Sequence, residues 1–154
     1  MKKSAFVYTL AEEIISELKT YCKRIRIAGS LRRKEKSVHD IDLVLIPKNR
    51  ERLEEFMEKK GERLQGGKYE STWLVKGVKV ELYYTNEKEW CAELLAYSSR
   101  KGSGIGLRMV AKRRGLRLNQ HGLFRRKTGK RIAGKTEREI YAALGRRYKS
   151  PRDR

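Results

Sequence analysis

The sequence predicts an α+β fold, with a small mixed sheet backed by helices in its first part and a small helical second part that carries a β-hairpin. Helical spacing of apolar residues near the N-terminus, and β-rich runs ended by Gly or Pro further on, predict the first part. Helical spacing then dominates the second part. At 154 residues the chain can hold one compact core with a small appended lobe, and we place the boundary between residues 1–88 and 89–154.

The first helix is expected from about residue 10 to residue 21. Thr9 and Glu12 have the spacing of a capping box, and apolar residues then recur every three or four positions. A second, more polar helix is expected in the stretch that ends at Gly61.

The strands of the first part are read from alternation and from their end signals. Residues 25–28 alternate and stop at a Gly-Ser pair, and residues 41–46 form a second strand that Pro47 ends. Residues 69–76 and 78–84 resemble a hairpin, which we expect to lie beside the strand at 41–46.

The second part begins with a cap-like run at residues 86–89 and a helix after it, and another helix is expected from 105 to 114. Strand-like residues flank Asn-Gln-His-Gly at 119–122, which predicts a hairpin. Thr136 is expected to cap a last short helix, and the basic tail at 148–154 is expected to be loosely held.

Charge narrows the classes of partner. The formal net charge is +20, from 39 Lys and Arg against 19 Asp and Glu, which predicts strong attraction to a polyanion such as nucleic acid. No segment has the length or the amphipathic pattern of a membrane helix. Without a secretory leader pattern we expect an intracellular, cytoplasmic protein whose Cys22 and Cys91 are reduced thiols.

Two carboxylates form the first candidate site. Asp40 and Asp42 stand two positions apart at the entry to a predicted strand, so both side chains point to the same face. Like charges this close repel unless a cation neutralises them, and oxygen ligands of this kind suit Mg²⁺ or Mn²⁺. Alternatively, Asp40 ends a turn and Asp42 is an exposed strand residue.

The segment upstream of the carboxylates favours the metal-site reading. Residues 29–33 read Gly-Ser-Leu-Arg-Arg and follow a predicted strand. Gly29 lets the backbone approach closely, while the Ser30 hydroxyl and the Arg33 guanidinium can hold phosphate groups against the metals. Phosphate recognition and metal recognition therefore converge.

Glu81 is the candidate third ligand. Alternation in the strand at 78–84 places Lys79, Glu81 and Tyr83 on the face opposite the buried residues. Two-metal chemistry needs a further carboxylate to clamp the attacking and leaving oxygens. The alternative is a surface Glu paired with a Lys.

The Gly-Ser motif followed by Asp40-Ile41-Asp42 resembles the active-site signature of the DNA polymerase X family. Residues 107–109 and 115–124 are similar to that family's thumb, and residues 136–141 and 148–154 to its C-terminal helix and end. The resemblance covers nearly the whole chain and is closest to compact, virus-type members that consist of a palm and a thumb. It implies a nucleotidyltransferase palm with a helical thumb.

The resemblance implies template-directed addition of dNTPs to a primer 3′ end in gapped or nicked duplex DNA, by a monomer that uses two Mg²⁺ or Mn²⁺ ions. Asp40, Asp42 and Glu81 would be the catalytic metal ligands. The nucleotide would contact Gly29, Ser30, Arg33, Tyr97, Ser98 and Asn119. The DNA would contact Arg108, Lys112, Arg113, Arg117, His121, Arg125 and Arg126.

Departures from the family pattern qualify these expectations. The third carboxylate is usually Asp, so Glu81 carries one extra methylene, and residues 96–100 lack one ring of the usual aromatic pair. We therefore expect modest fidelity and ribonucleotide use. Two other functions stay open, a non-templated nucleotidyltransferase acting on RNA or another acceptor, and a basic nucleic-acid-binding module with vestigial carboxylates.

Overall fold

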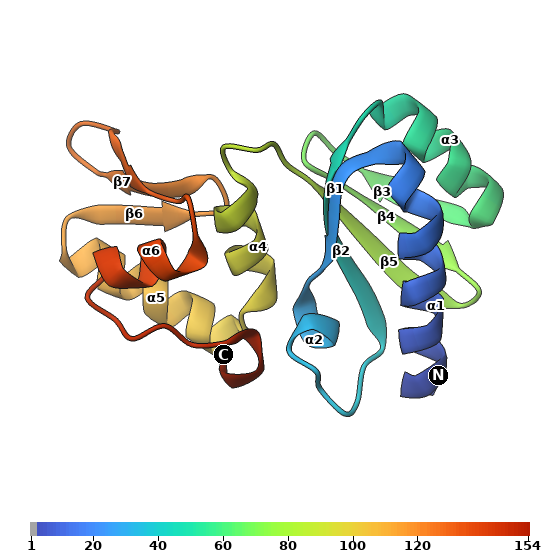
Figure 1. Ribbon diagram of the computed structural model, residues 1–154, viewed down its shortest axis with the longest axis horizontal. Coiled ribbons are helices and arrows are strands. Elements are labelled where there is room, and N and C mark those ends of the chain that lie inside the picture. Colours follow the sequence, from blue (N-terminus) through green and yellow to red (C-terminus); the bar gives the residue numbers. More distant parts are fainter. Residues whose placement is uncertain (1–2) are drawn as a thin grey trace. The chain divides into compact units, whose positions relative to one another are not determined.

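The computed structural model describes residues 3–154 as two compact units, one ending at Thr85 and one beginning at Asn86 (Figure 1). The first unit holds a five-stranded sheet with helices, and the second holds helices with a three-stranded sheet. The predicted α+β class is confirmed.

The sheet of the first unit has the strand order β1-β2-β5-β4-β3. β2 and β5 pair in parallel, whereas the other neighbours pair antiparallel. The predicted hairpin beside the strand at 41–46 is therefore confirmed. The strands are β1 (Cys22–Ile27), β2 (Asp40–Pro47), β3 (Glu62–Gly66), β4 (Glu70–Val75) and β5 (Val78–Tyr84).

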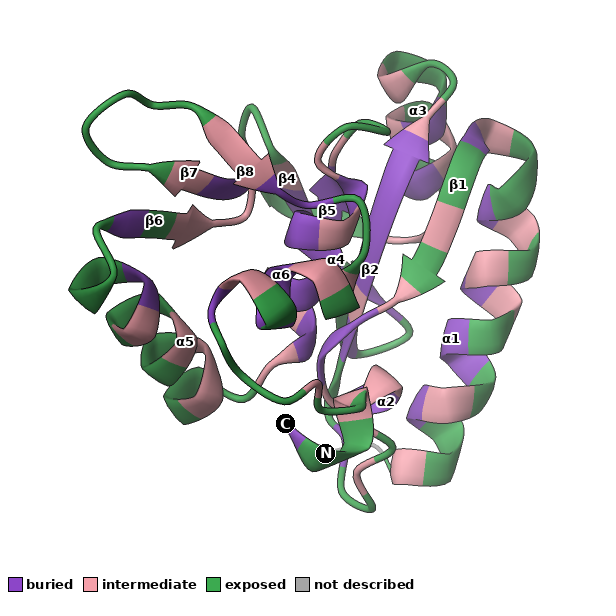
Figure 2. Cartoon of the chain, turned by 60° about the vertical axis from the view of Figure 1, so that its left-hand side comes forward, coloured by how far each residue is buried: buried purple, intermediate pink, exposed green. Residues whose placement is uncertain are grey.

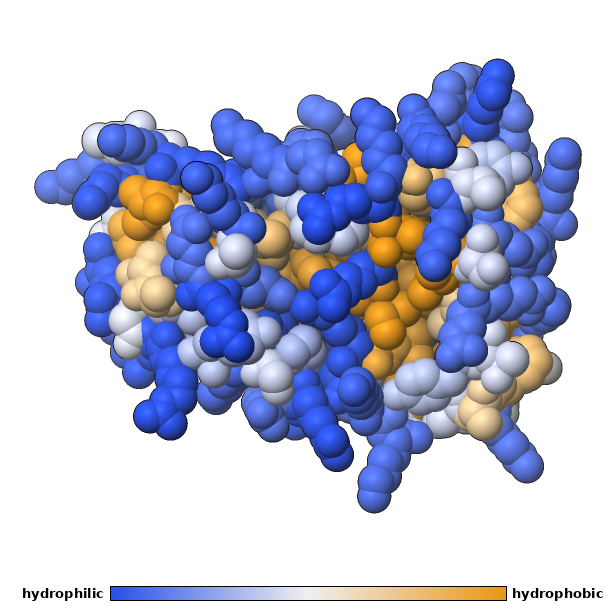
Figure 3. Space-filling model, viewed as in Figure 1, coloured by the Kyte–Doolittle hydropathy of each residue, from blue (hydrophilic) through white to orange (hydrophobic). Residues whose placement is uncertain are grey.

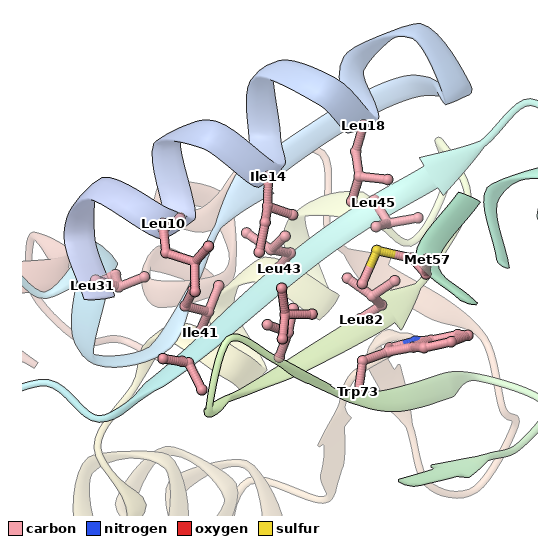
Figure 4. Close-up of a cluster of buried hydrophobic side chains, with 14 of the residues drawn as sticks. Leu10, Ile14, Leu18, Leu31, Ile41, Leu43, Leu45, Met57, Trp73 and Leu82 are labelled. Atoms are coloured by element: carbon pink, nitrogen blue, oxygen red, sulfur yellow. The ribbon is translucent and has the colours of Figure 1, made fainter. Parts of the chain in front are cut away.

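Helices α1 (Ser4–Leu18) and α3 (Arg50–Lys60) cover one face of this sheet. Figure 4 shows Leu10, Ile14 and Leu18 of α1 pointing toward the side chains of β2. Burying these apolar side chains is the main contribution to the stability of the unit. Because side chains alternate along a strand, the acidic residues of β2 and β5 lie on the face away from these helices.

Two expectations for the first unit are wrong. α1 begins at Ser4, and Thr9 lies inside it with its hydroxyl donating to the Ala5 carbonyl at 3.0 Å, so Thr9 is no cap. Residues 62–66, for which no strand is predicted, form the edge strand β3. Their side chains are all exposed, so no apolar pattern marks them. In contrast, β2 is buried along most of its length (Figure 2).

The second unit packs α4, α5 and α6 with a small sheet of order β6-β7-β8. Asn119 pairs with Gly122 at the β6–β7 turn, which confirms the predicted hairpin. Thr136 accepts the Glu139 N–H at 3.0 Å and caps α6 as expected. The elements are α4 (Trp90–Ser98), α5 (Lys101–Arg113), β6 (Leu116–Asn119), β7 (Gly122–Arg125), β8 (Arg131–Ala133) and α6 (Glu137–Ala143).

The C-terminal tail is not loosely held. The Arg154 side chain is 0% exposed, and its Nη1 lies 2.7 Å from Glu137 Oε2. Its Nε donates to the Lys149 carbonyl at 3.0 Å, and its guanidinium lies 5.7 Å from the Tyr148 ring. A buried ion pair therefore anchors the tail to α6. The basic composition of the tail does not reveal this anchor, because an Arg is usually exposed unless it is paired with a carboxylate.

α5 also begins earlier than expected, at Lys101, and includes Gly102, Gly104 and Gly106.

Hydrophilic residues cover most of the face of each unit shown in Figure 3. Neither Cys22 nor Cys91 forms a disulfide bond within the described residues. Within residues 3–154, every helix is too short or too polar to cross a membrane.

Candidate active site

The Gly-Ser motif and the strand that carries the carboxylates meet at the start of α2 (Gly29–Arg32), a single helical turn that begins where a turn was expected. Gly29 has φ +58, and a Cβ there would lie 2.2 Å from Asp42 Oδ2. The Ala28 N–H donates to the Asp42 carbonyl at 2.8 Å. Only Gly fits both this backbone conformation and this close approach.

Asp42 and Glu81 lie opposite each other in the parallel pairing of β2 and β5. Each side chain is partly buried, and the two carboxyl groups share a hydrogen bond. The Tyr83 hydroxyl lies 3.3 Å from Asp42 Oδ1 and also within hydrogen-bond distance of Glu81 Oε2, so its single proton lies between the two carboxyl groups. Lys79 Nζ lies 2.9 Å from Glu81 Oε1, so Glu81 both faces Asp42 and is paired with a Lys.

Burial and the neighbouring acid change how this pair ionises. Burial, together with the hydrogen bond and negative charge of Glu81, raises the pKa of Asp42 to about 7. Burial also acts to raise the pKa of Glu81, but hydrogen bonds from Asp42, Tyr83 and Lys79 outweigh it and hold that pKa below its ordinary value. The two carboxyl groups therefore share one proton near neutral pH.

Asp40 lies on the same strand face but is exposed, and its charge contributes to the raised pKa of Asp42. Among residues 3–154, no three acidic, His or Cys side chains lie close enough together to form a complete metal site. Asp40 must therefore turn toward Asp42 and Glu81 if it is to share an ion with them.

Ser30 lies within α2, and Arg33 directly follows that helical turn. Ser30 is partly exposed, as expected for a residue that meets a ligand. Arg33 Nη2 forms an ion pair with Glu35 Oε2 at 3.2 Å, and its side chain is 13% exposed. An anion bound here must compete with Glu35 for the guanidinium.

In the second unit, Tyr97, Arg108 and Asn119 line one pocket of about 320 Å³. This volume is in the range of small-molecule sites. Ser98, in contrast, is fully buried and does not line the pocket. Asn119 Oδ1 accepts the His121 N–H at 2.8 Å, so this side chain also shapes the hairpin turn.

Basic residues surround a second hollow of about 280 Å³ on the second unit. Its apolar surface includes Ile105 and Met109, which are 42% and 47% exposed. Four of the predicted DNA-binding residues line it, namely Arg108, Lys112, Arg117 and Arg126. Arg113 and Arg125 are exposed as well, whereas His121 is paired with Glu89 and acts as a turn residue.

The role of Tyr83 was missed in the sequence, although alternation placed it on the carboxylate face. Alternation along a strand gives the face of a side chain but not its rotamer, so nothing in the sequence marks its hydroxyl as a bridge. Its side chain is only 7% exposed, which keeps both hydrogen bonds out of competition with water.

Comparisons with known proteins agree on one family. Residues 93–154 match the DNA polymerase beta thumb family. The chain is 27% identical over 149 residues to the repair DNA polymerase X of African swine fever virus (isolate Pig/Kenya/KEN-50/1950), covering 89% of this chain and 84% of the viral protein. It is 28% identical over 148 residues to the DNA polymerase/3′-5′ exonuclease PolX of Bacillus subtilis, covering 91% of this chain and 26% of that protein.

A solved structure shares the fold. The polymerase beta of Leishmania infantum, in a ternary P/T complex, matches with a TM-score of 0.82 and 20% sequence identity. The match covers 98% of this chain and 74% of that one.

Proposed function

Since this chain belongs to the DNA polymerase X family, we propose that it is a DNA-directed DNA polymerase that extends a primer 3′ end along a template. The names of the viral and bacterial relatives support this activity. The finer part of the proposal is repair synthesis on gapped or nicked duplex DNA, carried out by a monomer with dNTPs as substrates.

The observation that carries the proposal is the pairing of Asp42 with Glu81, next to the Gly29 turn. The pKa of Asp42 is raised beside the Glu81 carboxylate, and a divalent cation would relieve this repulsion because it would replace the shared proton. The donors are oxygen atoms only, which suits Mg²⁺ or Mn²⁺. Asp42 and Glu81 would hold the ions, with Asp40 joining from the strand entry.

Bound ions would supply Lewis acidity for the attacking and leaving oxygens. The chain's own residues do the positioning. Gly29 keeps the backbone close to Asp42, and Ser30 and Arg33 are suitably placed beside it to hold the triphosphate. Arg33 would exchange its Glu35 partner for phosphate, so triphosphate binding and release of that ion pair are linked.

The second unit would bind nucleotide and DNA. Its pocket at Tyr97, Arg108 and Asn119 offers an aromatic ring, a cation and an amide, which suits a base and the neighbouring template. The basic hollow around Ile105 and Met109 combines apolar surface with four cations, which suits DNA backbone and bases. Such backbone contacts carry no sequence preference.

A gap-filling assay tests the proposal. A labelled primer on DNA with a single-nucleotide gap is incubated with each dNTP and rNTP under Mg²⁺ or Mn²⁺. We expect the templated nucleotide to be added, and Asp42→Ala to slow addition about a thousandfold or more, because losing an ion removes several kcal/mol of charge stabilisation. Sedimentation of the protein with and without DNA tests the monomer.

Other outcomes of the same assay point elsewhere. Addition that ignores the template would indicate a nucleotidyltransferase with another acceptor. DNA binding without incorporation under either metal would indicate a basic nucleic-acid-binding protein. Normal extension by Asp42→Ala would remove the proposed site.

A further inference from the structure

Both oxygens of Glu81 are held by residues of its own strand. Lys79, two positions before it, has its Nζ 2.9 Å from Oε1, and Tyr83, two positions after it, donates its hydroxyl to Oε2. The same hydroxyl reaches Asp42 Oδ1 at 3.3 Å on the neighbouring strand. Residues two apart share one face of a strand, so alternation along β5 brings all three groups together.

Glu81 needs such support because of its length. A Glu side chain has one more rotatable bond than Asp and can therefore swing its carboxylate away from a neighbouring strand. A ligand that must act together with Asp42 gains from being held in one rotamer before the ion arrives, because ordering it later weakens binding.

We propose that Tyr83 is the positioning residue that fixes the Glu81 carboxylate beside Asp42, so that the longer acid serves as a metal ligand from this strand. The inference rests on the proposed function, in which Glu81 holds a metal ion. Tyr83 acts through Glu81 and Asp42 and does not itself ligate the ion.

Tyr83 contributes more than Lys79 to this positioning. The Tyr83 side chain is 7% exposed, so its hydrogen bonds to the carboxylates are shielded from water. The Lys79 side chain is 46% exposed, and an ion pair in water contributes little. Removing the Lys79 charge should therefore change metal affinity by no more than about fivefold.

The first test compares two neighbouring tyrosines. Tyr83→Phe removes the bridging hydroxyl, whereas Tyr84→Phe removes one on the opposite face, which donates to Glu54 Oε2 at 2.7 Å. Mn²⁺ affinity of the protein alone is measured by EPR. Because partners of metal ligands typically account for about 10- to 100-fold in affinity or activity, we expect a loss of that size for Tyr83→Phe and none for Tyr84→Phe.

Kinetics add a second measurement. Tyr83→Phe should lower kcat for primer extension by a similar factor and leave the KM for DNA unchanged, because the hydroxyl bonds to the carboxylates, whereas the proposed DNA contacts lie in the second unit. A general folding defect would instead lower the fraction of active protein in both variants. Equal Mn²⁺ affinities for the wild-type protein and Tyr83→Phe would overturn the proposal.

A double-mutant cycle identifies the residue through which Tyr83 acts. In a Glu81→Asp background the carboxylate is shorter by one methylene, so Tyr83→Phe should change Mn²⁺ affinity by less than about threefold. The same loss in both backgrounds would show that Tyr83 acts independently of Glu81 and would refute the inference. If Glu81→Ala kept full Mn²⁺ affinity and extension, the proposed role of Glu81 would fail first.

Discussion

Replacing Asp42 with Asn should make the metal-free protein more stable. The pKa of Asp42 is raised from 3.8 to about 7, mainly by burial and then by Glu81. One pKa unit corresponds to about 1.4 kcal/mol, so ionising Asp42 at neutral pH costs at most about 4 kcal/mol of folding free energy. Asn keeps the shape and a hydrogen bond to Glu81, and because its own amide must also be desolvated we expect a gain of about 1–3 kcal/mol.

The pH dependence gives this prediction its sign. Between pH 4 and pH 7 the folded protein holds a proton on Asp42 that the unfolded chain has lost. The folded state therefore binds more protons, and this contribution to the free energy of unfolding falls as pH rises through that window. Asp42→Asn lacks the contribution, so the two proteins should differ more at neutral pH than near pH 4.

Urea unfolding in EDTA, followed by tryptophan fluorescence, measures the effect, because Trp73 is fully buried in the core of the same unit. Asp40→Asn is the matched control on the same strand. Asp40→Asn removes an exposed charge that contributes only a minor part of the rise in the pKa of Asp42. Its increase in the free energy of unfolding should therefore be smaller than that of Asp42→Asn. Added Mg²⁺ should stabilise the wild-type protein more than Asp42→Asn. Equal stabilities at neutral pH, or a difference that does not change with pH, would refute the reasoning.

Three further predictions concern other features. Gly29→Ala should abolish primer extension and lower the free energy of unfolding in urea by about 1–3 kcal/mol. The reason is that residue 29 has φ +58 and that the added Cβ would lie 2.2 Å from Asp42 Oδ2, so an active variant would contradict the tight fit. Arg154→Ala should lower the stability of the second unit by about 3–5 kcal/mol, since it leaves Glu137 without its buried partner, and an unchanged urea midpoint would argue against the anchor. DNA affinity should fall about 10³- to 10⁵-fold between roughly 50 and 200 mM salt if the protein makes roughly six to ten phosphate contacts. An affinity that does not change with salt in a binding titration would exclude binding dominated by the DNA backbone.

Sequence patterns predicted the elements that bury apolar faces, and missed those that do not. β2 contains a continuous apolar run and β5 alternates in its first half, so both strands and their pairing were predicted. β3 has only exposed side chains and left no pattern. The start of α1 was misplaced because a capping-box spacing at Thr9 occurs inside the helix, where the hydroxyl bonds back to the preceding turn.

The candidate site was predictable in its residues and less so in its contacts. The alternation of side chains along each strand predicted that Asp42 and Glu81 lie on the face away from the buried residues. The parallel register of β2 and β5 then places them opposite each other. Spacing could not reveal the ion pair that occupies Arg33 or the hydroxyl of Tyr83 between the acids, because both depend on rotamers chosen in three dimensions.

The parallel register of β2 and β5 is set by buried apolar residues and not by the acidic residues on the other face of the sheet. A slip of one residue would drive Glu81 into the apolar layer and expose Leu82, which is 0% exposed. The hydrophobic layer beneath α1 therefore sets the alignment, and the acids above it contribute nothing to keeping it. Side chains on the face that carries Asp40, Asp42 and Glu81 can therefore be replaced while the fold is kept. The same sheet could then support a different reaction without a change of fold.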